Sequence, residues 1–370
     1  MSTISTSSLA VIAFAIMGLS CGGSRTALSP CGPVCSASSF VYGTTSGTSQ
    51  VLFFPVAQNG TLSSPASLPG PALSAGITVS LSRELFVADH IQGKLYTYVR
   101  NSSNQYSAGP GSPYQIASGP GLEGIALTPD SKSLYVEDFN QGVFGYSIAA
   151  DGSLTLIPGS PFGGGGYAQP VVDGTGKFLI LAGPIAVTVL QIDSTTGALH
   201  PTGNFVTLPA SSLITTGMAA MAPGTNYLYV ALASANAIAA YAMDTTSGAL
   251  TLVSGSPFTA GQLPLTLTAS QSGTLYVVNS GDSTLSALSI DKNTGSLTAV
   301  PGSPFSAAWA GGVPAILSSQ YFYVASVNNI FSPTVNAVLG YSIGSGGSLT
   351  PLNGSPFPTG AQLRGGLAAF

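Results

Sequence analysis

The sequence carries very little charge. Only 5% of its 370 residues are Asp, Glu, Lys or Arg, against about a quarter in a typical soluble protein. Eight Lys and Arg against twelve Asp and Glu give a net charge of −4, and the positive residues are scattered. A protein that binds nucleic acid needs a basic patch to neutralise phosphates. We therefore expect no nucleic-acid partner.

Several patterns that carry chemistry are also absent. No run of 18 apolar residues occurs, so an integral membrane protein is not expected. The two histidines, His90 and His200, lie far apart in the sequence, and there is no Gly-x-Ser-x-Gly motif. Serine hydrolase chemistry is therefore unsupported. Gly163–Gly166 has no helical pattern after it and is expected to be a loop, not a phosphate-binding turn.

What the sequence does have is a repeat of about 48 residues. Gly-Ser-Pro followed by Phe or Tyr begins at Gly111, Gly159, Gly255, Gly302 and Gly354, with gaps of 48, 96, 47 and 52 residues. Weaker copies stand near the remaining expected positions, at Ser63–Pro65 and Phe205–Pro209. Seven units of one fixed period are typical of a solenoid, a propeller or an array.

Each unit holds four short runs that read as β-strands. The second run is often Leu-Tyr-Val, as at Leu134, Leu228 and Leu275, and such runs bounded by Gly, Asn, Asp and Ser favour strands. The third and fourth runs are joined by segments such as Asp193–Gly197, where Asp bonds backbone amides and Gly supplies a positive φ. We predict an all-β fold, a seven-bladed β-propeller with four antiparallel strands per blade.

The two ends of the repeat region supply parts of one blade. Gln362–Phe370 reads as an innermost strand without partners, and Ser39–Gly43 opens a unit that lacks an innermost strand. Joining them completes the seventh blade, closes the ring and hides the sheet edges. Residues 38–370 are therefore predicted to form one propeller domain.

Residues 1–20 are predicted to be a signal peptide. Leu9–Leu19 is an apolar stretch of 11 residues, the length of a signal-peptide core and too short for a membrane span. The segment Gly18–Gly23 around Cys21 resembles a bacterial lipoprotein signal, in which Cys21 would be acylated. We expect an exported protein of the periplasm or cell surface, held to the membrane only by a lipid anchor, with residues 21–37 as a tether.

The tether also holds Cys31 and Cys35. In an exported chain this pair favours a disulfide around a short loop, and two free thiols are the alternative. Since no histidine lies near these cysteines, we expect no metal site, and nothing in the sequence indicates a cofactor.

Propeller topology assigns most charged residues to one of two faces. The hairpins between first and second strands and between third and fourth strands lie on one face, the bottom. The loop into the innermost strand and the hairpin between second and third strands lie on the other, the top. Nine residues with turn-forming roles fall on the bottom: Asp130, Lys132, Asp151, Asp173, Lys177, Asp193, Asp244, Asp291 and Lys292. Arg83, Glu84 and Arg100 are expected at solvated strand ends.

The top face collects most of the remaining charge and one histidine. Glu123 and Arg364 stand one residue before the innermost strands of their blades and are expected to point at the mouth of the central channel. With His90 they come from three consecutive blades and form a candidate catalytic set that could bind a carbonyl-bearing or anionic ligand and activate water. The alternative is an Arg364–Glu123 ion pair in a solvated rim that serves solubility. The other charged residues on this face are Asp89, Lys94, Glu137, Asp138 and Asp282, of which Asp89, Asp138 and Lys94 are candidate ligand-binding residues.

The repeating pattern Leu-Tyr-Val, Tyr-Ser-Ile, Thr-Gly-Ala/Ser-Leu and Gly-Ser-Pro-Phe resembles the seven-bladed lactonase family, over roughly residues 38–370. This family includes bacterial 6-phosphogluconolactonase and the fungal carboxymuconate-lactonising enzyme, and it is related to Tyr-Val-Thr-Asn propeller repeats. Family enzymes tend to carry a Pro-Arg-His segment entering an innermost strand. Leu363–Ala368 aligns with that segment, retaining the Arg as Arg364 and carrying Gly365 in place of the His.

The resemblance implies hydrolysis of a sugar lactone or a related ester, in which Arg364 would polarise the carbonyl and Glu123 or His90 would act as base. Export and the shortage of cations argue against a phosphorylated substrate. The alternative is a non-catalytic propeller of the cell envelope that binds a glycan or a protein partner, because the rim has few ionisable groups. A monomer is expected.

Overall fold

The computed structural model describes residues 39–45, 48–102, 105–163, 169–209, 219–307, 313–317, 320–326, 336–361 and 363–369. The signal peptide, the tether and Cys21, Cys31 and Cys35 lie outside these residues. Within them, no helix combines the length and the hydrophobicity that crossing a membrane requires.

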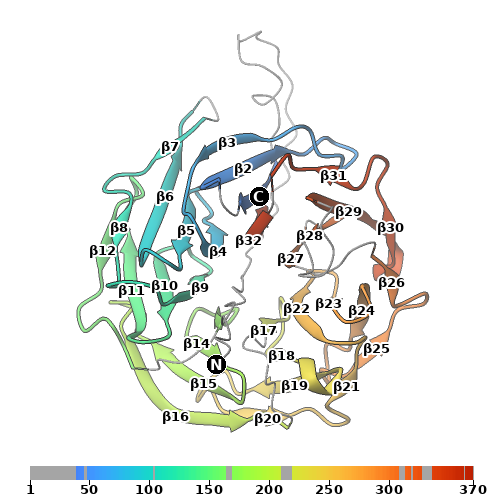
Figure 1. Cartoon of the computed structure of the whole chain (residues 1–370). Helices are drawn as coiled ribbons and strands as arrows, with labels where there is room; N and C mark the ends of the chain where they lie inside the picture. The colour runs from blue at the N-terminus through green and yellow to red at the C-terminus, as the bar shows by residue number, and fades with distance from the viewer. Residues whose placement is uncertain are drawn as a thin grey trace, which may run out of the picture.

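The described residues form seven antiparallel sheets arranged as the blades of a ring (Figure 1). Each blade runs from an innermost strand at the centre of the ring to a fourth strand at its outer edge. Blade 1 is β32 (Leu363–Ala369), β1 (Phe40–Thr45), β2 (Gln50–Pro55) and β3 (Ala66–Pro69). Blade 2 is β4 (Ser74–Val79), β5 (Leu85–Asp89), β6 (Lys94–Arg100) and β7 (Tyr106–Ala108). Blade 3 is β9 (Leu122–Leu127), β10 (Ser133–Asp138), β11 (Gly142–Ile148) and β12 (Leu154–Leu156). Blade 4 is β13 (Gln169–Val172), β14 (Phe178–Ala182), β15 (Ala186–Ile192) and β16 (Leu199–Thr207).

The last three blades repeat the plan. Blade 5 is β17 (Ala219–Met221), β18 (Tyr227–Leu232), β19 (Ala237–Met243) and β20 (Leu250–Leu252). Blade 6 is β22 (Pro264–Ala269), β23 (Thr274–Asn279), β24 (Thr284–Ile290) and β25 (Leu297–Ala299). Blade 7 is β27 (Val313–Leu317), β28 (Tyr321–Ser326), β29 (Ala337–Ile343) and β30 (Leu349–Pro351). Short strands β8 (Tyr114–Gln115), β21 (Phe258–Thr259), β26 (Phe305–Ser306) and β31 (Phe357–Pro358) pair with third strands. The predicted seven-bladed propeller is confirmed.

The ring is closed by the two ends of the described chain. β32 pairs with β1 through Val41–Ala369 and Tyr42–Ala368, and it packs against β27 of blade 7 and β4 of blade 2 (Figure 1). The predicted clasp from the C-terminal strand is therefore confirmed. It gives β1 a partner on the side that would otherwise be an open sheet edge.

The hydrophobic core is divided among the contacts between blades. The described residues form seven buried clusters, one between each pair of neighbouring blades. The repeated Tyr of the second strand links most of these contacts, because its hydroxyl donates to the carbonyl of a turn glycine in the next blade. The pairs are Tyr135–Gly197 at 2.8 Å, Tyr229–Gly295 at 2.9 Å, Tyr276–Gly347 at 3.0 Å and Tyr323–Gly60 at 2.7 Å.

The Gly-Ser-Pro motif has a structural role at the outer edge. In all five copies the serine Oγ accepts a backbone N–H of the third strand, as Ser303 does from Ala287 at 2.9 Å. The hydroxyl thus satisfies a strand group at the point where the short fourth strand has ended. Blade 4 has lost the motif, and its outer strand β16 instead runs on for nine residues.

The predicted roles of the bottom-face aspartates agree with the structure. Asp193 Oδ1, for example, accepts backbone N–H groups from Thr195 and Thr196 at 2.9 and 2.7 Å. The expectation of solvated strand ends at Glu84 and Arg100 is wrong. Glu84 is only 8% exposed and its carboxylate accepts the hydroxyl of Ser80, and the Arg100 guanidinium nitrogens are buried.

Candidate functional site

The top ends of several innermost strands carry a β-bulge. In blade 3, Glu137 pairs with Gly124 and Asp138 with Leu122, which leaves Glu123 as an extra residue in β9. In blade 1 the pairing moves from Gly43–Leu367 directly to Thr45–Leu363, so residues 364–366 lie opposite Thr44. A bulge re-aims the side chain of its extra residue and is common beside active sites.

Arg364 and Glu123 therefore occupy comparable bulges, two blades apart. The intervening blade 2 has the same register shift around Ala75, and its strand β4 packs against both β32 and β9. The predicted origin of Arg364, His90 and Glu123 in three consecutive blades agrees with the topology. The side chain of Arg364 lies outside the described part of the structure.

His90 and Glu123 are brought together. His90 directly follows β5, and its Nδ1 lies 3.0 Å from the carbonyl oxygen of Leu122 and 3.4 Å from Glu123 Oε1. The His90 and Glu123 side chains are 11% and 4% exposed. A carbonyl oxygen can only accept a hydrogen bond, so in neutral His90 the ring proton is on Nδ1 and the free lone pair is on Nε2. This arrangement leaves Nε2 as the basic atom.

Asp89, His90, Glu123, Glu137 and Asp138 together form what we call the His90–Glu123 corner. Burial and neighbouring charge shift the pKa values of its two glutamates. Burial, and then the negative charge of Asp138, raise the pKa of Glu123 to about 7. Burial, followed by Glu123 and Asp138, raises the pKa of Glu137 to about 10. Glu137 is fully buried, and neither of its carboxyl oxygens has a hydrogen-bond partner among the residues that the structure describes. At neutral pH Glu137 is therefore a neutral acid and Glu123 is near its midpoint.

Asp89 and Asp138 have a clear local role. Each ends a second strand, and Oδ1 of each accepts two backbone N–H groups of the following hairpin at 2.9 to 3.1 Å. Asn279 ends β23 at the corresponding place in blade 6. The second oxygen of each aspartate is buried, and no described residue forms a hydrogen bond with it. Lys94 pairs with Asp89 across its hairpin, but its Nζ donates to Gln92 Oε1 at the exposed surface.

The corner is therefore not the solvated rim of the alternative interpretation. Asp89, Glu123, Glu137 and Asp138 are all less than 5% exposed, so that part of the expectation is wrong. From the sequence, Glu137 was expected only as one of several charged residues on the top face. Its burial could have been inferred, because Glu137 in Leu134–Asp138 stands at the place where the equivalent strand Leu275–Asn279 has a valine.

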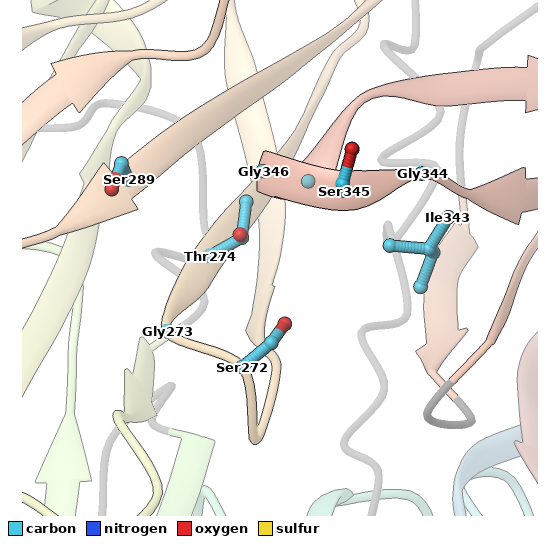
Figure 2. Close-up of a pocket in the computed structure, with 9 residues that line it drawn as sticks. Ser272, Gly273, Thr274, Ser289, Ile343, Gly344, Ser345 and Gly346 are labelled. Atoms are coloured by element: carbon cyan, nitrogen blue, oxygen red, sulfur yellow. The ribbon is translucent and has the colours of Figure 1, made fainter.

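No metal centre is formed by the described residues, among which no three His, Cys, Asp or Glu side chains are grouped as ligands. A cavity of about 360 Å³ lies on the opposite, bottom face between blades 6 and 7 (Figure 2). It is lined by two turns, Ser272–Thr274 and Gly344–Gly347, with Ser289 and Ile343. The blade 7 turn lacks the Asp of its counterparts and is rich in glycine, which leaves the space. Without an ionisable lining group, this cavity offers less chemistry than the His90–Glu123 corner.

Comparisons with known proteins agree with this fold. The family model described as "Lactonase, 7-bladed beta-propeller" matches residues 185–307. No curated protein matches the chain.

Solved structures similar to this chain include a periplasmic gluconolactonase of Pseudomonas aeruginosa, with a TM-score of 0.69 and 16% identity over 88% of this chain and 99% of that one. A functionally unknown protein of Desulfotomaculum acetoxidans has a TM-score of 0.65 and 15% identity, over 89% and 98% of the two chains. A candidate 6-phosphogluconolactonase of Bacteroides fragilis has a TM-score of 0.57 and 21% identity, over 72% and 82%.

At these identities the solved structures establish the fold alone. The family match adds a likeness in sequence across blades 4 to 6. The chain is thus a seven-bladed β-propeller, and over residues 185–307 its sequence is similar to the seven-bladed lactonases that its repeats resemble.

Proposed function

We propose that this propeller hydrolyses a non-phosphorylated sugar lactone or a related ester at the top face of blades 1 to 3. The observation that carries the proposal is the buried His90–Glu123 pair, with Nδ1 of His90 bonded to the Leu122 carbonyl and 3.4 Å from Glu123 Oε1. A carboxylate beside one nitrogen of an imidazole orients the ring and stabilises its protonated form, which makes the other nitrogen an effective base.

In the proposed reaction, Nε2 of His90 takes a proton from a water molecule as the water oxygen attacks the carbonyl carbon. The ionised Glu123 stabilises the resulting imidazolium, and Arg364 stabilises the negative charge on the carbonyl oxygen. The tetrahedral intermediate then breaks its ring C–O bond, and the imidazolium returns the proton to the leaving oxygen. The products are a hydroxy acid and the neutral His90. Of the two bases open from the sequence, the tautomer favours His90.

A substrate without phosphate fits the charge of this corner. Four carboxyl side chains are buried there, and the described residues supply only His90 as a counter-charge. A phosphate group would be repelled by those of these carboxyl groups that are ionised, and it would need several cationic donors, whereas His90 alone is supplied by the described residues.

The decisive experiment is hydrolysis of gluconolactone by the purified chain and its His90→Ala, Glu123→Gln and Arg364→Ala variants. We expect each variant to lose at least about ten-fold in kcat/KM, and His200→Ala, which changes an exposed outer-strand histidine, to behave as wild type. Rates equal to the uncatalysed reaction for the wild type, or equal rates in all variants, would remove the enzyme proposal.

Under the second candidate, a non-catalytic envelope propeller, the chain binds a glycan or a protein partner. The specific observation in its favour is Gly365, which stands where family enzymes carry a histidine. It is the candidate to pursue if gluconolactone and neutral ester substrates are all left intact.

The proposed location is the cell envelope, with Cys21 as a lipid anchor and the propeller as a monomer. Its support is the apolar segment Leu9–Leu19, which leads into Gly18–Gly23 as a signal-peptide core would. Metabolic labelling with a fatty acid tests it, since Cys21→Ala should abolish incorporation. Incorporation that survives this substitution would argue against a lipoprotein.

A further inference from the structure

The segment Pro120–Leu122, at the start of β9, binds His90 of the neighbouring blade at two points. The Gly121 N–H donates to the backbone carbonyl of His90 at 3.0 Å. The Leu122 carbonyl oxygen lies 3.0 Å from His90 Nδ1. His90 belongs to blade 2, but the orientation of its ring therefore depends on where this segment of blade 3 lies.

The hairpin between β10 and β11 fixes the position of the segment. The Phe139 N–H donates to the Gly121 carbonyl at 2.9 Å, and Asn140 Nδ2 donates to the Pro120 carbonyl at 3.1 Å. The Asp138 carboxylate is itself held in place, because its Oδ1 accepts two backbone N–H groups of the hairpin. Contacts thus run without a break from the hairpin through Gly121 to the His90 ring.

Gly121 lies so close to Asp138 that no side chain fits between them. A Cβ atom placed on Gly121 would lie 2.9 Å from Asp138 Cγ, closer still to Asp138 Oδ2, and 3.0 Å from Asn140 Nδ2. Real Cβ atoms are scarcely ever found within 3.0 Å of a neighbouring atom, so either the carboxylate or the segment would have to move. The φ of Gly121 is not left-handed. Space, and not backbone conformation, therefore requires the glycine.

The repeat itself does not require a glycine at this position. The bond from the Phe139 N–H to the Gly121 carbonyl has counterparts in two other blades. In blade 2 the His90 N–H donates to the Leu73 carbonyl at 2.8 Å, and in blade 6 the Ser280 N–H donates to the Leu263 carbonyl at 3.0 Å. Both of these blades carry leucine where blade 3 has glycine, so Gly121 is a feature of the blade whose segment binds His90.

We propose that Gly121 is a positioning residue for His90. Because it has no side chain, the segment lies against the Asp138 carboxylate, where the Leu122 carbonyl accepts the Nδ1–H of His90. The ring then keeps its Nε2 lone pair free. A larger residue would push the segment from the hairpin and take the Leu122 carbonyl out of reach of Nδ1. The importance of Gly121 for catalysis rests on the proposed function, whereas its effect on the ring does not.

The test is the tautomer of His90 in Gly121→Ala, read from the chemical shifts of the imidazole nitrogens at a pH where the ring is neutral. These shifts distinguish a protonated ring nitrogen from a bare one. His200→Ala is present in every protein, so that His90 supplies all the signals. We expect the proton on Nδ1 in the wild type and mainly on Nε2 in Gly121→Ala. Gly174→Ala is the matched control, because a Cβ on this bottom-face glycine meets no atom within 4 Å, and it should keep the wild-type tautomer.

A double variant tests whether the contact with Asp138 is the cause. Asp138→Ser keeps an oxygen that can accept hairpin N–H groups and removes the carboxylate oxygen that the new methyl group would meet. Added to Gly121→Ala, it should return the proton to Nδ1. An unchanged tautomer in Gly121→Ala would overturn the proposal. So would a double variant that is unfolded or keeps the proton on Nε2, when Asp138→Ser alone behaves as the wild type.

Gluconolactone hydrolysis separates this inference from the proposed function. If both hold, Gly121→Ala should lower kcat by about ten-fold or more with little change in KM, since a misplaced base impairs the reaction more than binding. If the tautomer changes as expected but the wild type hydrolyses no lactone, the proposed function fails and the positioning role stands. If kcat falls while the tautomer stays on Nδ1, the positioning role fails and the enzyme stands.

Discussion

Glu137 should make the stability of the propeller fall as pH rises, and replacing it by Gln should remove that dependence. Its pKa is raised from 4.5 to about 10, chiefly by burial. Below pH 4.5 the folded and unfolded chains both hold the proton, so Glu137 has no effect on the pH dependence there. Between the two values only the folded chain holds it, and the unfolded chain gains free energy by releasing it.

The size of the effect follows from this gap. One pH unit within the window is worth about 1.4 kcal/mol, so going from about pH 5 to about pH 8 should lower the free energy of unfolding by up to about 4 kcal/mol. For a domain of roughly this length, that corresponds to about 6 °C in melting temperature. Glu123, whose pKa is raised to about 7, adds to the slope in both the wild type and the variant.

Scanning calorimetry at the two ends of this pH interval, on the wild type and Glu137→Gln, measures the difference. The wild type should lose several degrees more than the variant. Asp151→Asn serves as control, because it changes an exposed hairpin carboxylate whose pKa is lowered by hydrogen bonds from Ser153. If the melting temperatures of the wild type and Glu137→Gln fall by the same amount over this interval, Glu137 is not a neutral acid in the folded protein.

Three further outcomes are expected. Asp138→Asn should move the acid limb of the pH–rate profile for lactone hydrolysis to lower pH by about 0.5–1 unit. The substitution removes a charge that raises the pKa of Glu123, while Asn keeps the oxygen that accepts the hairpin N–H groups. An unmoved pH–rate profile would contradict this reasoning. Tyr323→Phe should lower the free energy of unfolding by about 1 kcal/mol in denaturant melts, because it removes the hydrogen bond to the Gly60 carbonyl. Tyr96→Phe, which is not one of the second-strand tyrosines, is the control, and an equal loss from it would argue against a particular role for the Tyr–Gly hydrogen bond. Truncation after Thr359 should lower the melting temperature sharply and cause aggregation because it deletes β32, and deletion of residues 1–35 should scarcely change it; similar effects of the two truncations would count against the clasp.

The fold could be predicted because its determinants are local and repeated. Each unit carries its own turn residues, and the second-strand Tyr and the turn Gly that appear as separate motifs prove to be hydrogen-bond partners in adjacent blades. The closing strand could be assigned because the first unit has three strands and lacks an innermost one, and an unpartnered strand follows the last complete unit. Blade 4 was harder to recognise, since its continuous strand β16 replaces Gly-Ser-Pro.

The candidate site was predicted only in part. Topology places His90 and Glu123 at the top of adjacent blades, but no sequence rule gives the bulge at Glu123 or the Leu122 carbonyl that fixes the His90 tautomer. Burial was misjudged for the same reason. Glu84 and Arg100 stand at strand ends in the sequence, but the Glu84 carboxylate turns back onto Ser80 within its own hairpin. Arg100 packs on Tyr106 of its own blade and on Phe40 of the neighbouring blade, and a contact across blades has no local signature.

The pairing of β1 with β32 also constrains the order of assembly. Tyr42 and Ala368 are neighbours in one sheet although almost the whole length of the propeller separates them in the sequence. Blades 2 to 7 can form as the chain is made, and β1 can pair with β2, but the inner edge of β1 stays unpaired until β32 emerges. Contacts of this sequence separation are slow to form, and an unpaired strand edge is a site of aggregation. During synthesis and any passage across a membrane, the inner edge of β1 is therefore open to wrong pairing until β32 covers it, and a chaperone that shields this edge would favour correct closure.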